Sequence, residues 1–462
     1  MTIARLLLCS IALVITGVGQ QPTFKKLDPK IYESYLGTYQ FSSGELIIIG
    51  RSVRRLFFFE PGTGRARGLI PASETSAAET TWSAGPSLAV FTPTTARITF
   101  TKNKRGEISG LIFKEPAGPD RVAKKAGFYK EEEVSFENGD VTLAGKLLIP
   151  STNGPHPAAI FLHGSGAQDR NGERSEIRWV ADHFARHGIA ALIYDKRGLG
   201  VAGSTGNLAT AGFNDFARDA LAGVKLLQSR PEINPQQIGM WGISQAGWVM
   251  LAATSMSKDI AFIISVSAGG SGYTPAQQNN YNIATEMRTA GFSSDEVTRV
   301  IASWDLLYDV VRAGEGGDGT KLDAAVRLAQ QNAKLKDWLP DLSSEIDWKK
   351  RDRWYLAMDL DLDPAPLWAR YDGPVLGIFG ELDSSTPVQQ VVPILGKALA
   401  SRPNTDYAIT VFPKANHNIM QAVTGSDSEL PKLDRFVPQY LETMTNWLKT
   451  RIAAKTKSRV RR

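Results

Sequence analysis

The sequence predicts an α/β fold in which a mainly parallel sheet of the eight-stranded type carries a helical insertion and follows a small antiparallel β domain. Three observations predict it. Short β-like runs fill the N-terminal part, apolar strands alternate with helical stretches over residues 126–455, and a long, mostly helix-like segment separates two of those strands. A chain of 462 residues is long enough for an accessory module beside a large core.

The N-terminal β domain is expected over residues 22–125. Runs such as "GELIIIG" and "RRLFFFEPGTG" are separated by Gly, Pro and Ser, which is typical of a small antiparallel sheet or barrel. The segment contains no histidine and shows no catalytic group of residues. We expect a packing or accessory module, with ligand or polysaccharide binding as the alternative.

The larger domain, residues 126–455, begins with a predicted hairpin, "EEEVSFENGDVTLAGKLLIP", in which Asn138-Gly139 supplies the positive φ angles of a tight turn. Buried strands are then predicted at "AAIFL", "IAALIY", "IGMWG", "AFIISVS", "VLGIFG" and "YAITVF", most of them separated by helical stretches. Apolar strands that alternate with helices predict a mainly parallel sheet covered on both faces.

A helical lid is expected at about residues 270–368. This insertion is far longer than a strand-to-helix connection requires, and it would cover the carboxyl ends of the strands, where open α/β sheets bind ligands. It holds half of the ten tryptophans, namely Trp304, Trp338, Trp348, Trp354 and Trp368. Most of them are expected to pack the insertion onto the body, although they also suggest an apolar substrate group.

Residues 1–20 have the pattern of a cleaved signal peptide: a positive charge, the apolar run "LLLCSIALVITGVG" and small residues before a polar pair. The run is short for a spanning helix, so we expect an exported protein, periplasmic or secreted, with no stable membrane span after cleavage. An uncleaved anchor is the alternative. Cys9, the only cysteine, would leave with the signal, which excludes disulfides and thiolate chemistry in the mature chain.

The net charge of +6 is concentrated at the C-terminus. Seven of the 53 Lys and Arg residues lie in the last fourteen positions, "KTRIAAKTKSRVRR", which contain no acid. The rest of the chain is therefore close to neutral, and no nucleic-acid partner is predicted. Residues 456–462 are expected to be a solvated basic tail, with association to anionic surfaces as the alternative.

The stretch "IGMWGISQAGW" places Ser244 in a strand, a sharp turn and a helix, which is the context of an exposed nucleophilic serine. The usual G-x-S-x-G pattern has a glycine where this chain has Ala246, and Gly247 follows one position later. Because alanine adds a single methyl group, we interpret the stretch as a tolerated variant.

A serine nucleophile needs a general base and an acid that orients it. His417, in "VFPKANHNIM", is the only one of the five histidines that follows Ser244. Asp383, in "VLGIFGELDSSTP", lies just past the end of the preceding strand and is the predicted acid, with Glu381 as the second candidate.

Backbone donors for an oxyanion are expected in "HGSG". This glycine-rich turn follows a predicted strand and can direct the N–H of Ser165 at a reacting carbonyl, with the N–H of Gln245 as the second donor. Gly164 is the alternative to Ser165. His163 is expected to be a structural residue of the turn.

The remaining motifs of the sequence do not indicate a metal or a cofactor. His183 and His187 have the i, i+4 spacing of a metal pair but no clear third ligand, so a surface helix is expected. In "YDKRGLG", Asp195 and Arg197 are expected to form an ion pair that braces the loop. Neither a G-x-G-x-x-G nor a P-loop pattern occurs.

These residues resemble the α/β-hydrolase superfamily over roughly residues 127–452. "HGSG", "DKRGLG", "GISQAG", "GELDSSTP" and "ANHN" are similar to its oxyanion turn, a strand-end loop, its nucleophile elbow, acid loop and histidine loop. The chain looks most like exported bacterial serine esterases of the EstD type, and it is also similar to the serine aminopeptidase and prolyl-oligopeptidase branches. The resemblance implies a triad of Ser244, Asp383 and His417, with Ser165 and Gln245 as oxyanion donors.

The implied activity is hydrolysis of small-molecule carboxylic esters through an acyl-enzyme, with no metal or cofactor. A serine exopeptidase of the same fold is the alternative, and it would need a carboxylate that binds the substrate ammonium; the lid offers Glu345, Asp347 and Asp359. A binding protein without catalysis is the third reading. The oligomeric state is left open by the sequence.

Overall fold

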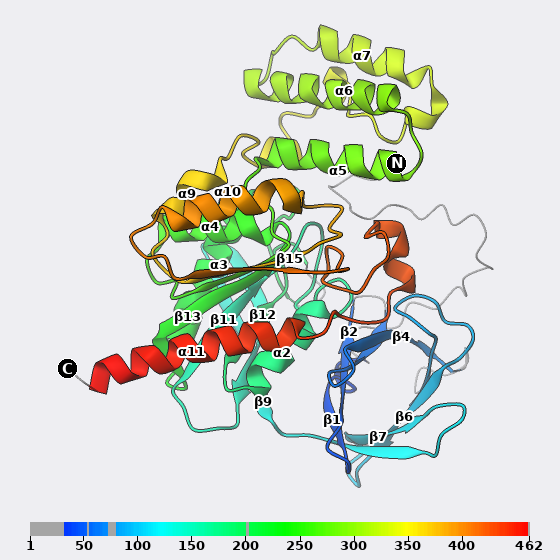
Figure 1. The fold of residues 1–462 in the computed structure, drawn as a ribbon, viewed down its shortest axis with the longest axis vertical. Coiled ribbons are helices and arrows are strands. Elements are labelled where there is room, and N and C mark those ends of the chain that lie inside the picture. The colour runs from blue at the N-terminus through cyan, green and yellow to red at the C-terminus, as the bar shows by residue number, and fades with distance from the viewer. Residues whose placement is uncertain (1–31, 53–54, 73–79, 200–202, 461–462) are drawn as a thin grey trace.

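The computed structural model describes residues 32–52, 55–72, 80–199 and 203–460, which form a β-barrel, an α/β domain and a helical lid (Figure 1). The predicted signal peptide lies outside the described residues. In the described ranges, no helix combines the length and the apolar character that crossing a membrane requires.

The N-terminal domain is a closed antiparallel barrel in which each strand pairs with the next and β1 pairs with β8. Alternate residues of its strands point inward, as Ala96, Ile98 and Phe100 do in β6. Its strands are β1 (Gly37–Phe41), β2 (Leu46–Arg51), β3 (Leu56–Glu60), β4 (Arg65–Pro71), β5 (Thr81–Ala84), β6 (Ala96–Lys102), β7 (Ile108–Lys114) and β8 (Arg121–Lys125).

The second sheet has eight strands in the order β16-β15-β14-β13-β11-β12-β10-β9. Strands β11 to β16 are parallel to one another, whereas β10 pairs antiparallel with β12 and with β9 at one edge. This confirms the predicted mainly parallel sheet. The bounds are β9 (Tyr129–Asn138), β10 (Val141–Pro150), β11 (His156–Leu162), β12 (Ala190–Tyr194), β13 (Ile233–Ile243), β14 (Ile263–Val266), β15 (Val375–Gly380) and β16 (Tyr407–Phe412).

The hairpin at the start of this sheet differs in one detail from its prediction. Asn138 is still paired, opposite Val141, so the two loop residues are Gly139 and Asp140. Because Asn138 belongs to the strand, Gly139 alone supplies the positive φ, at 59°.

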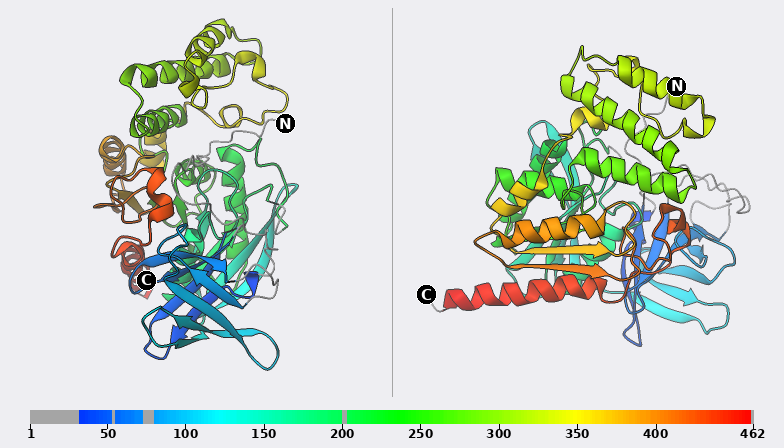
Figure 2. Two further views of the ribbon diagram at one scale, coloured as in Figure 1. Left: turned by 90° about the vertical axis from the view of Figure 1, so that its right-hand side faces the viewer. Right: turned by 45° about the horizontal axis from the view of Figure 1, so that its top comes forward.

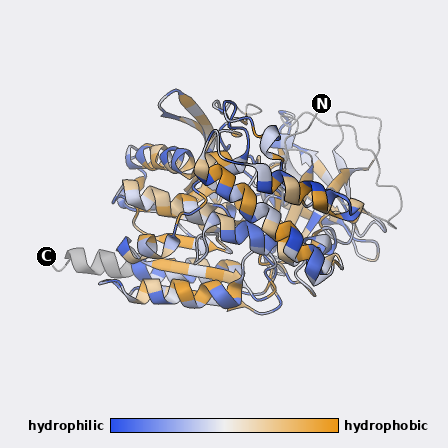
Figure 3. Cartoon of the chain, turned by 90° about the horizontal axis from the view of Figure 1, so that it is seen from above, coloured by the Kyte–Doolittle hydropathy of each residue, from blue (hydrophilic) through white to orange (hydrophobic). Residues whose placement is uncertain are grey.

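Helices cover both faces of the sheet (Figure 1). One face carries α2 (Glu176–Arg186) and α11 (Tyr440–Val460), and the other carries α3 (Phe213–Gln228), α4 (Ala246–Met256), α9 (Pro364–Arg370) and α10 (Val388–Ala400). Hydrophobic and hydrophilic residues alternate along the helices seen from above (Figure 3), as helices with one buried face require. Since α11 runs to Val460, most of the expected basic tail continues this helix.

The lid rises above one end of the α/β domain (Figure 2) and has a hydrophobic core of its own. It consists of α5 (Pro275–Thr289), α6 (Ser294–Ala313), α7 (Thr320–Gln330), α8 (Trp354–Ala357) and two short 3₁₀ turns, Ala333–Leu335 and Ser343–Glu345. Four of the five tryptophans of the insertion pack in or against that core, namely Trp304, Trp338, Trp348 and Trp354. Trp368 lies in the core of the α/β domain, and its Nε1 donates to the carbonyl of Gly270 at 2.7 Å.

These tryptophans are therefore used for packing, as expected for most of them. They give no argument for an apolar substrate group.

The barrel shares a hydrophobic core with the α/β domain. Phe59 of β3 stacks on Trp179 of α2 with ring centroids 5.2 Å apart and meets the edge of Phe436 at 5.6 Å. Both partners belong to the cluster that also fills one face of the eight-stranded sheet. The barrel is thus part of the same packed body, in agreement with the packing role expected for it.

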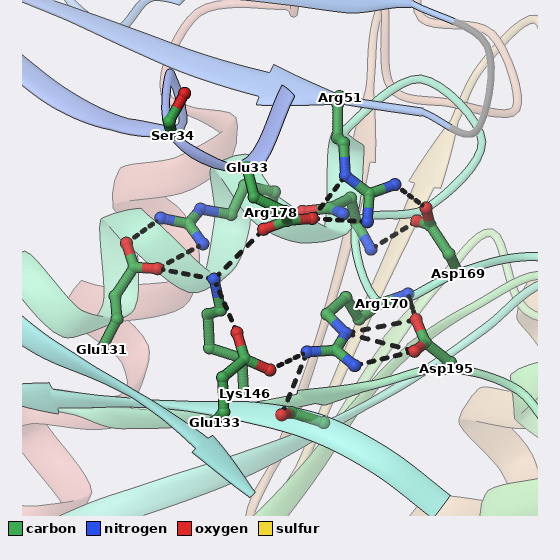
Figure 4. A network of polar contacts seen from close by, with 12 residues as sticks. Glu33, Ser34, Arg51, Glu131, Glu133, Lys146, Asp169, Arg170, Arg178 and Asp195 are labelled. Atoms are coloured by element: carbon green, nitrogen blue, oxygen red, sulfur yellow. Dashed lines mark hydrogen bonds and ion pairs between the residues drawn. The ribbon is translucent and has the colours of Figure 1, made fainter. Parts of the chain in front are cut away.

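A network of ion pairs continues this interface (Figure 4). Arg51 of the barrel binds Glu33 and also Asp169, which lies on the loop between β11 and α2. Nearby, Lys146 of β10 binds Glu33 together with two carboxylates of β9. Two of these pairs, Arg51 with Asp169 and Glu33 with Lys146, tie the N-terminal region to the α/β domain, and removal of one partner would leave a charge without compensation.

We expect Phe59→Ala to lower the free energy of unfolding of the whole protein by about 3–5 kcal/mol, because it removes a buried ring at the shared core. Urea unfolding followed by tryptophan fluorescence and circular dichroism should show a single transition at lower urea. Val122→Ala, at a barrel position that is 59% exposed, is the matched control. Separate transitions in which only the barrel is destabilised would contradict a shared core.

Candidate active site

Ser244 lies at a sharp turn between β13 and α4. Its φ is 58°, a conformation that is unusual for a residue with a side chain, and backbone hydrogen bonds to the segment after β14 hold it there. Its N–H donates to the carbonyl of Val266 at 3.1 Å, and its own carbonyl accepts the N–H of Gly269 at 2.9 Å. The half-buried serine therefore stands at the N-terminus of a helix and at the carboxyl end of the sheet.

The displaced glycine of the motif has a steric explanation. A Cβ at Gly247 would lie 1.8 Å from the carbonyl oxygen of Gly269, so a larger residue cannot occupy that position. Ala246 is fully buried, and its methyl group faces Gly242, which has no Cβ to collide with it. The close contact that needs a glycine thus falls at Gly247, and alanine fits at position 246.

Asp383 and His417 are in direct contact. Nδ1 of His417 lies 2.9 Å from both carboxylate oxygens of Asp383. The Asp383 side chain is completely buried, and its Oδ1 also accepts the N–H groups of Ser385 at 2.9 Å and Thr386 at 2.7 Å. These bonds fix the carboxylate, which in turn orients the imidazole so that Nε2 is left for another partner.

The second candidate acid, Glu381, has another role. Its carboxylate accepts the backbone N–H of Lys414 at 2.9 Å and so closes the turn that follows β16. The backbones of the two loops are also very close, because a Cβ at Gly380 would lie 2.3 Å from the carbonyl oxygen of Asn416. Glu381 and Gly380 therefore bring the acid loop and the histidine loop together.

Ser244 and His417 do not form a hydrogen bond here. Within the described part of the chain, the Ser244 hydroxyl has no hydrogen-bonding partner, although Ser244 follows β13 and His417 follows β16 at the same edge of the sheet. Hydrogen bonds of catalytic groups are often long before substrate binds and shorten in the complex. The structure thus joins two of the three predicted triad members directly and places the third at the same edge.

The oxyanion turn lies beside the elbow. A Cβ at Gly164 would be 3.5 Å from the Cβ of Ser244. In the described ranges, no backbone carbonyl accepts the N–H of Ser165 or of Gln245, so both donors expected from the sequence are available to a ligand. His163 is buried against Tyr194, and burial lowers the pKa of its imidazole to about 3, which agrees with a structural, neutral residue.

The pKa of His417 is raised above its usual value. Burial by itself would lower this pKa, but the carboxylate of Asp383, through its charge and hydrogen bond, and the charge of Asp427 outweigh that effect. Asp427, near the start of a 3₁₀ turn (Asp427–Lys432), was not identified from the sequence. Its pKa is raised by burial, as is that of Glu286 on α5, and the charge of Asp427 raises the pKa of Glu286 further.

The lid contacts both sides of this edge. Gln278 of α5 donates to the carbonyl of Ser385 on the acid loop, and Nε2 of Gln245 lies 3.8 Å from the sulfur of Met358. The predicted placement of the insertion over the carboxyl ends of the strands is therefore consistent with these contacts.

The remaining motifs are structural. His183 is buried, contrary to the expected surface helix, and its ring lies tilted against that of His187 with centroids 4.1 Å apart. Asp195 pairs with Arg170, and Arg197 pairs with Asp219, so the expected pairing of Asp195 with Arg197 is wrong. The described residues contain no cluster of His, Cys, Asp and Glu that could hold a metal ion.

The elbow, the acid loop and the histidine loop follow β13, β15 and β16. These strands belong to a sheet that is parallel except for two antiparallel strands at one edge. This arrangement makes the chain an α/β hydrolase. A model of the X-Pro dipeptidyl-peptidase (S15) family matches residues 138–376, which is just over half of the sequence, and the chain belongs to that family.

The chain is also similar to an esterase and to a thiohydrolase. The chain is 31% identical over 140 residues to esterase EstD of Thermotoga maritima, and the match covers 29% of this chain and 32% of EstD. It is 30% identical over 138 residues to thiohydrolase aneE of Aspergillus aculeatus, and the match covers 30% of this chain and 41% of aneE. The chain thus spans less than half of the length of each of these relatives. The resemblance to EstD-type esterases is confirmed.

One similar solved structure is the α/β hydrolase GrgF from Penicillium sp. sh18. It is 20% identical, with a TM-score of 0.42, and the match covers 70% of this chain and 99% of GrgF.

We expect Asp383→Asn to lower the pKa of His417, because a neutral amide no longer stabilises the imidazolium. An NMR titration of the His417 Cε1 proton should give a pKa above the usual 6.5 in the wild type and a clearly smaller value in the variant. Glu381→Gln is the matched control and should leave this pKa unchanged. An unchanged pKa in Asp383→Asn would show that Asp383 does not pair with His417 in solution.

Proposed function

We propose that the protein is a serine hydrolase that cleaves small-molecule carboxylic esters through an acyl-enzyme, with Ser244, His417 and Asp383 as its triad. The contact between His417 and Asp383, at the sheet edge that also carries the Ser244 turn, is the observation that supports this proposal most directly. The similarity to esterase EstD supports the choice of esters. The signal-like N-terminus supports an exported protein.

In the first step, Nε2 of His417 accepts the hydroxyl proton of Ser244 as the oxygen attacks the ester carbonyl. The N–H groups of Ser165 and Gln245 bind the developing oxyanion. Asp383 holds Nδ1 and stabilises the imidazolium, which then donates its proton to the leaving alcohol. In the second step, His417 activates a water molecule that attacks the acyl-enzyme and releases the acid.

The pH dependence follows from the raised pKa of His417. The imidazole of His417 must be neutral to accept the serine proton, so the enzyme is inactive while His417 is protonated. Because the pKa is raised, activity should rise with pH across a range that lies above the usual value of an exposed histidine.

A serine exopeptidase is the second candidate, and one observation favours it. Asp427 places a partly buried carboxylate near His417, Glu286 lies near Asp427, and Oε1 of Glu286 is buried without a hydrogen-bond partner in the described structure. Such a pair could bind the ammonium group of a peptide substrate, and the family name agrees with a peptidase. The acids offered by the sequence serve lid turns instead: Glu345 accepts the N–H of Leu342, Asp347 those of Lys349 and Lys350, and Asp359 that of Asp361.

The central test measures initial rates on p-nitrophenyl esters of several acyl lengths and on aminoacyl p-nitroanilides. We expect ester turnover in the wild type and a loss of at least about 10³-fold in Ser244→Ala, because the nucleophile is missing. Ser165→Ala is the matched control: its backbone N–H remains, so it should keep its activity within a few-fold. Full ester activity in a folded Ser244→Ala variant would refute the proposed mechanism.

The same assay separates the two candidates. If the protein is an exopeptidase, Glu286→Gln and Asp427→Asn should lower kcat/KM for the anilides by about ten- to a hundredfold through the lost contact to the ammonium, with esters nearly unaffected. Negligible anilide turnover in the wild type would exclude this candidate.

A further inference from the structure

Lys196 is a buried lysine that the proposed mechanism does not use. It follows β12 in "YDKRGLG", is only 4% exposed, and its Nζ lies 4.7 Å from the centre of the Phe216 ring. Three oxygen atoms surround the ammonium: the carbonyl of Gly164 at 2.8 Å, the carbonyl of Gly166 at 3.1 Å and Oε1 of Gln245 at 2.8 Å. An ammonium has three N–H donors, so this set uses all of them.

The contact to Gly164 fixes the direction of the Ser165 N–H. The peptide bond between these residues is trans, and in a trans peptide the C=O and the following N–H point in opposite directions. With the Gly164 oxygen directed at Lys196, the Ser165 N–H is directed away from it. The carbonyl of Ser165 is also held, because Nε2 of Gln168 donates to it at 2.8 Å.

The contact to Gln245 reaches the other side of the oxyanion site. Gln245 directly follows Ser244 and supplies the second proposed donor, its own backbone N–H. One ammonium therefore connects the two segments that carry both donors, although these segments are about eighty residues apart in the sequence.

We propose that Lys196 is a positioning residue that aligns the N–H groups of Ser165 and Gln245 toward the oxyanion and polarises the Gly164–Ser165 peptide. This inference rests on the proposed serine hydrolase function. A cation at the carbonyl end of a peptide makes its N–H a stronger donor, since hydrogen bonds in one chain polarise each other. The effect acts on the transition state, in which negative charge develops on the substrate oxygen.

The absence of a counter-ion distinguishes Lys196 from a structural lysine. In the described part of the chain, no carboxylate forms an ion pair with it, because neighbouring Asp195 is bound by Arg170 through its backbone N–H and its guanidinium (Figure 4). Burying an unpaired cation costs stability, so a residue that served the fold alone would be better neutral or paired. Lys146, also buried, shows the paired arrangement, with Glu33, Glu131 and Glu133 around it.

Burial lowers the pKa of Lys196 to about 7. The titratable group that interacts with it is His163 on the oxyanion turn, which stays neutral, while Phe216 on α3 and Gln245 at the elbow are uncharged. As pH rises through the lysine pKa, the ammonium loses one donor and its charge. The pH profile of kcat should therefore be bell-shaped, because kcat rises as His417 loses its proton and falls on the alkaline side as Lys196 loses its own.

The test compares Lys196→Met with the control Lys146→Met on a p-nitrophenyl ester. We expect Lys196→Met to lower kcat by about 10²-fold with little change in KM, because misaligned donors affect the transition state more than the bound substrate. It should also lose the alkaline fall in kcat. Lys146→Met should lower the melting temperature but keep kcat within threefold. A folded Lys196→Met with wild-type kcat would overturn the inference.

Failure of the inference and failure of the proposed function are distinguishable. If Ser244→Ala remains active, the proposed mechanism is wrong. If Ser244→Ala is inactive but a folded Lys196→Met keeps the wild-type kcat, the mechanism holds and Lys196 has no positioning role. Should Lys196→Met not fold, a structure of the wild type with a phosphonate bonded to Ser244 decides the question. We expect the phosphonate oxygen at about 2.7–3.1 Å from the N–H nitrogens of Ser165 and Gln245, with Lys196 still on the Gly164 carbonyl. A lysine that has moved onto the phosphonate, or a Ser165 N–H that points elsewhere, would overturn it.

Discussion

The proposed chemistry depends on the close approach of backbone segments at the carboxyl ends of β13 to β16. Where the elbow meets the segment after β14, Gly247 allows a contact that any side chain would prevent, and Gly380 does the same between the acid and histidine loops. These contacts let hydrogen bonds between loops, such as the one from Gly269 to Ser244, replace flexible connections. The geometry of the site is therefore a property of the backbone, and the side chains occupy positions that the packing has already fixed.

The barrel and the lid act on this edge in different ways. The barrel shares the core through Phe59 and Trp179, and its Arg51 binds Asp169 on the loop that begins with the oxyanion turn. The lid has its own core and touches the edge through polar side chains, such as Gln278, and through Met358. The barrel therefore supports the edge through a continuous core, whereas the lid is a separately packed unit that contacts it through side chains.

The electrostatics of the edge are asymmetric. Lys196, a cation for which the described residues supply no counter-ion, lies behind the oxyanion turn, whereas Asp383 and Asp427 act on His417 from the other side. Negative charge that develops on a substrate oxygen would be favoured on the first side, and an imidazolium on the second. This is the charge separation that proton transfer from serine to histidine creates, and low exposure strengthens both effects.

The sequence by itself determined the sheet, its helical cover and the candidates Ser244, Asp383 and His417, because strand periodicity, a sharp turn and chain order are local signals. It also favoured Asp383 over Glu381, whose carboxylate serves a turn. Only the tertiary structure decided the partners of side chains that meet across the chain: the burial of His183, the separate ion pairs of Asp195 and Arg197, the effect of Asp427 on His417, and the place of Lys196. Such contacts join residues far apart in the sequence, so no spacing or periodicity records them; they exist only once the loops have converged.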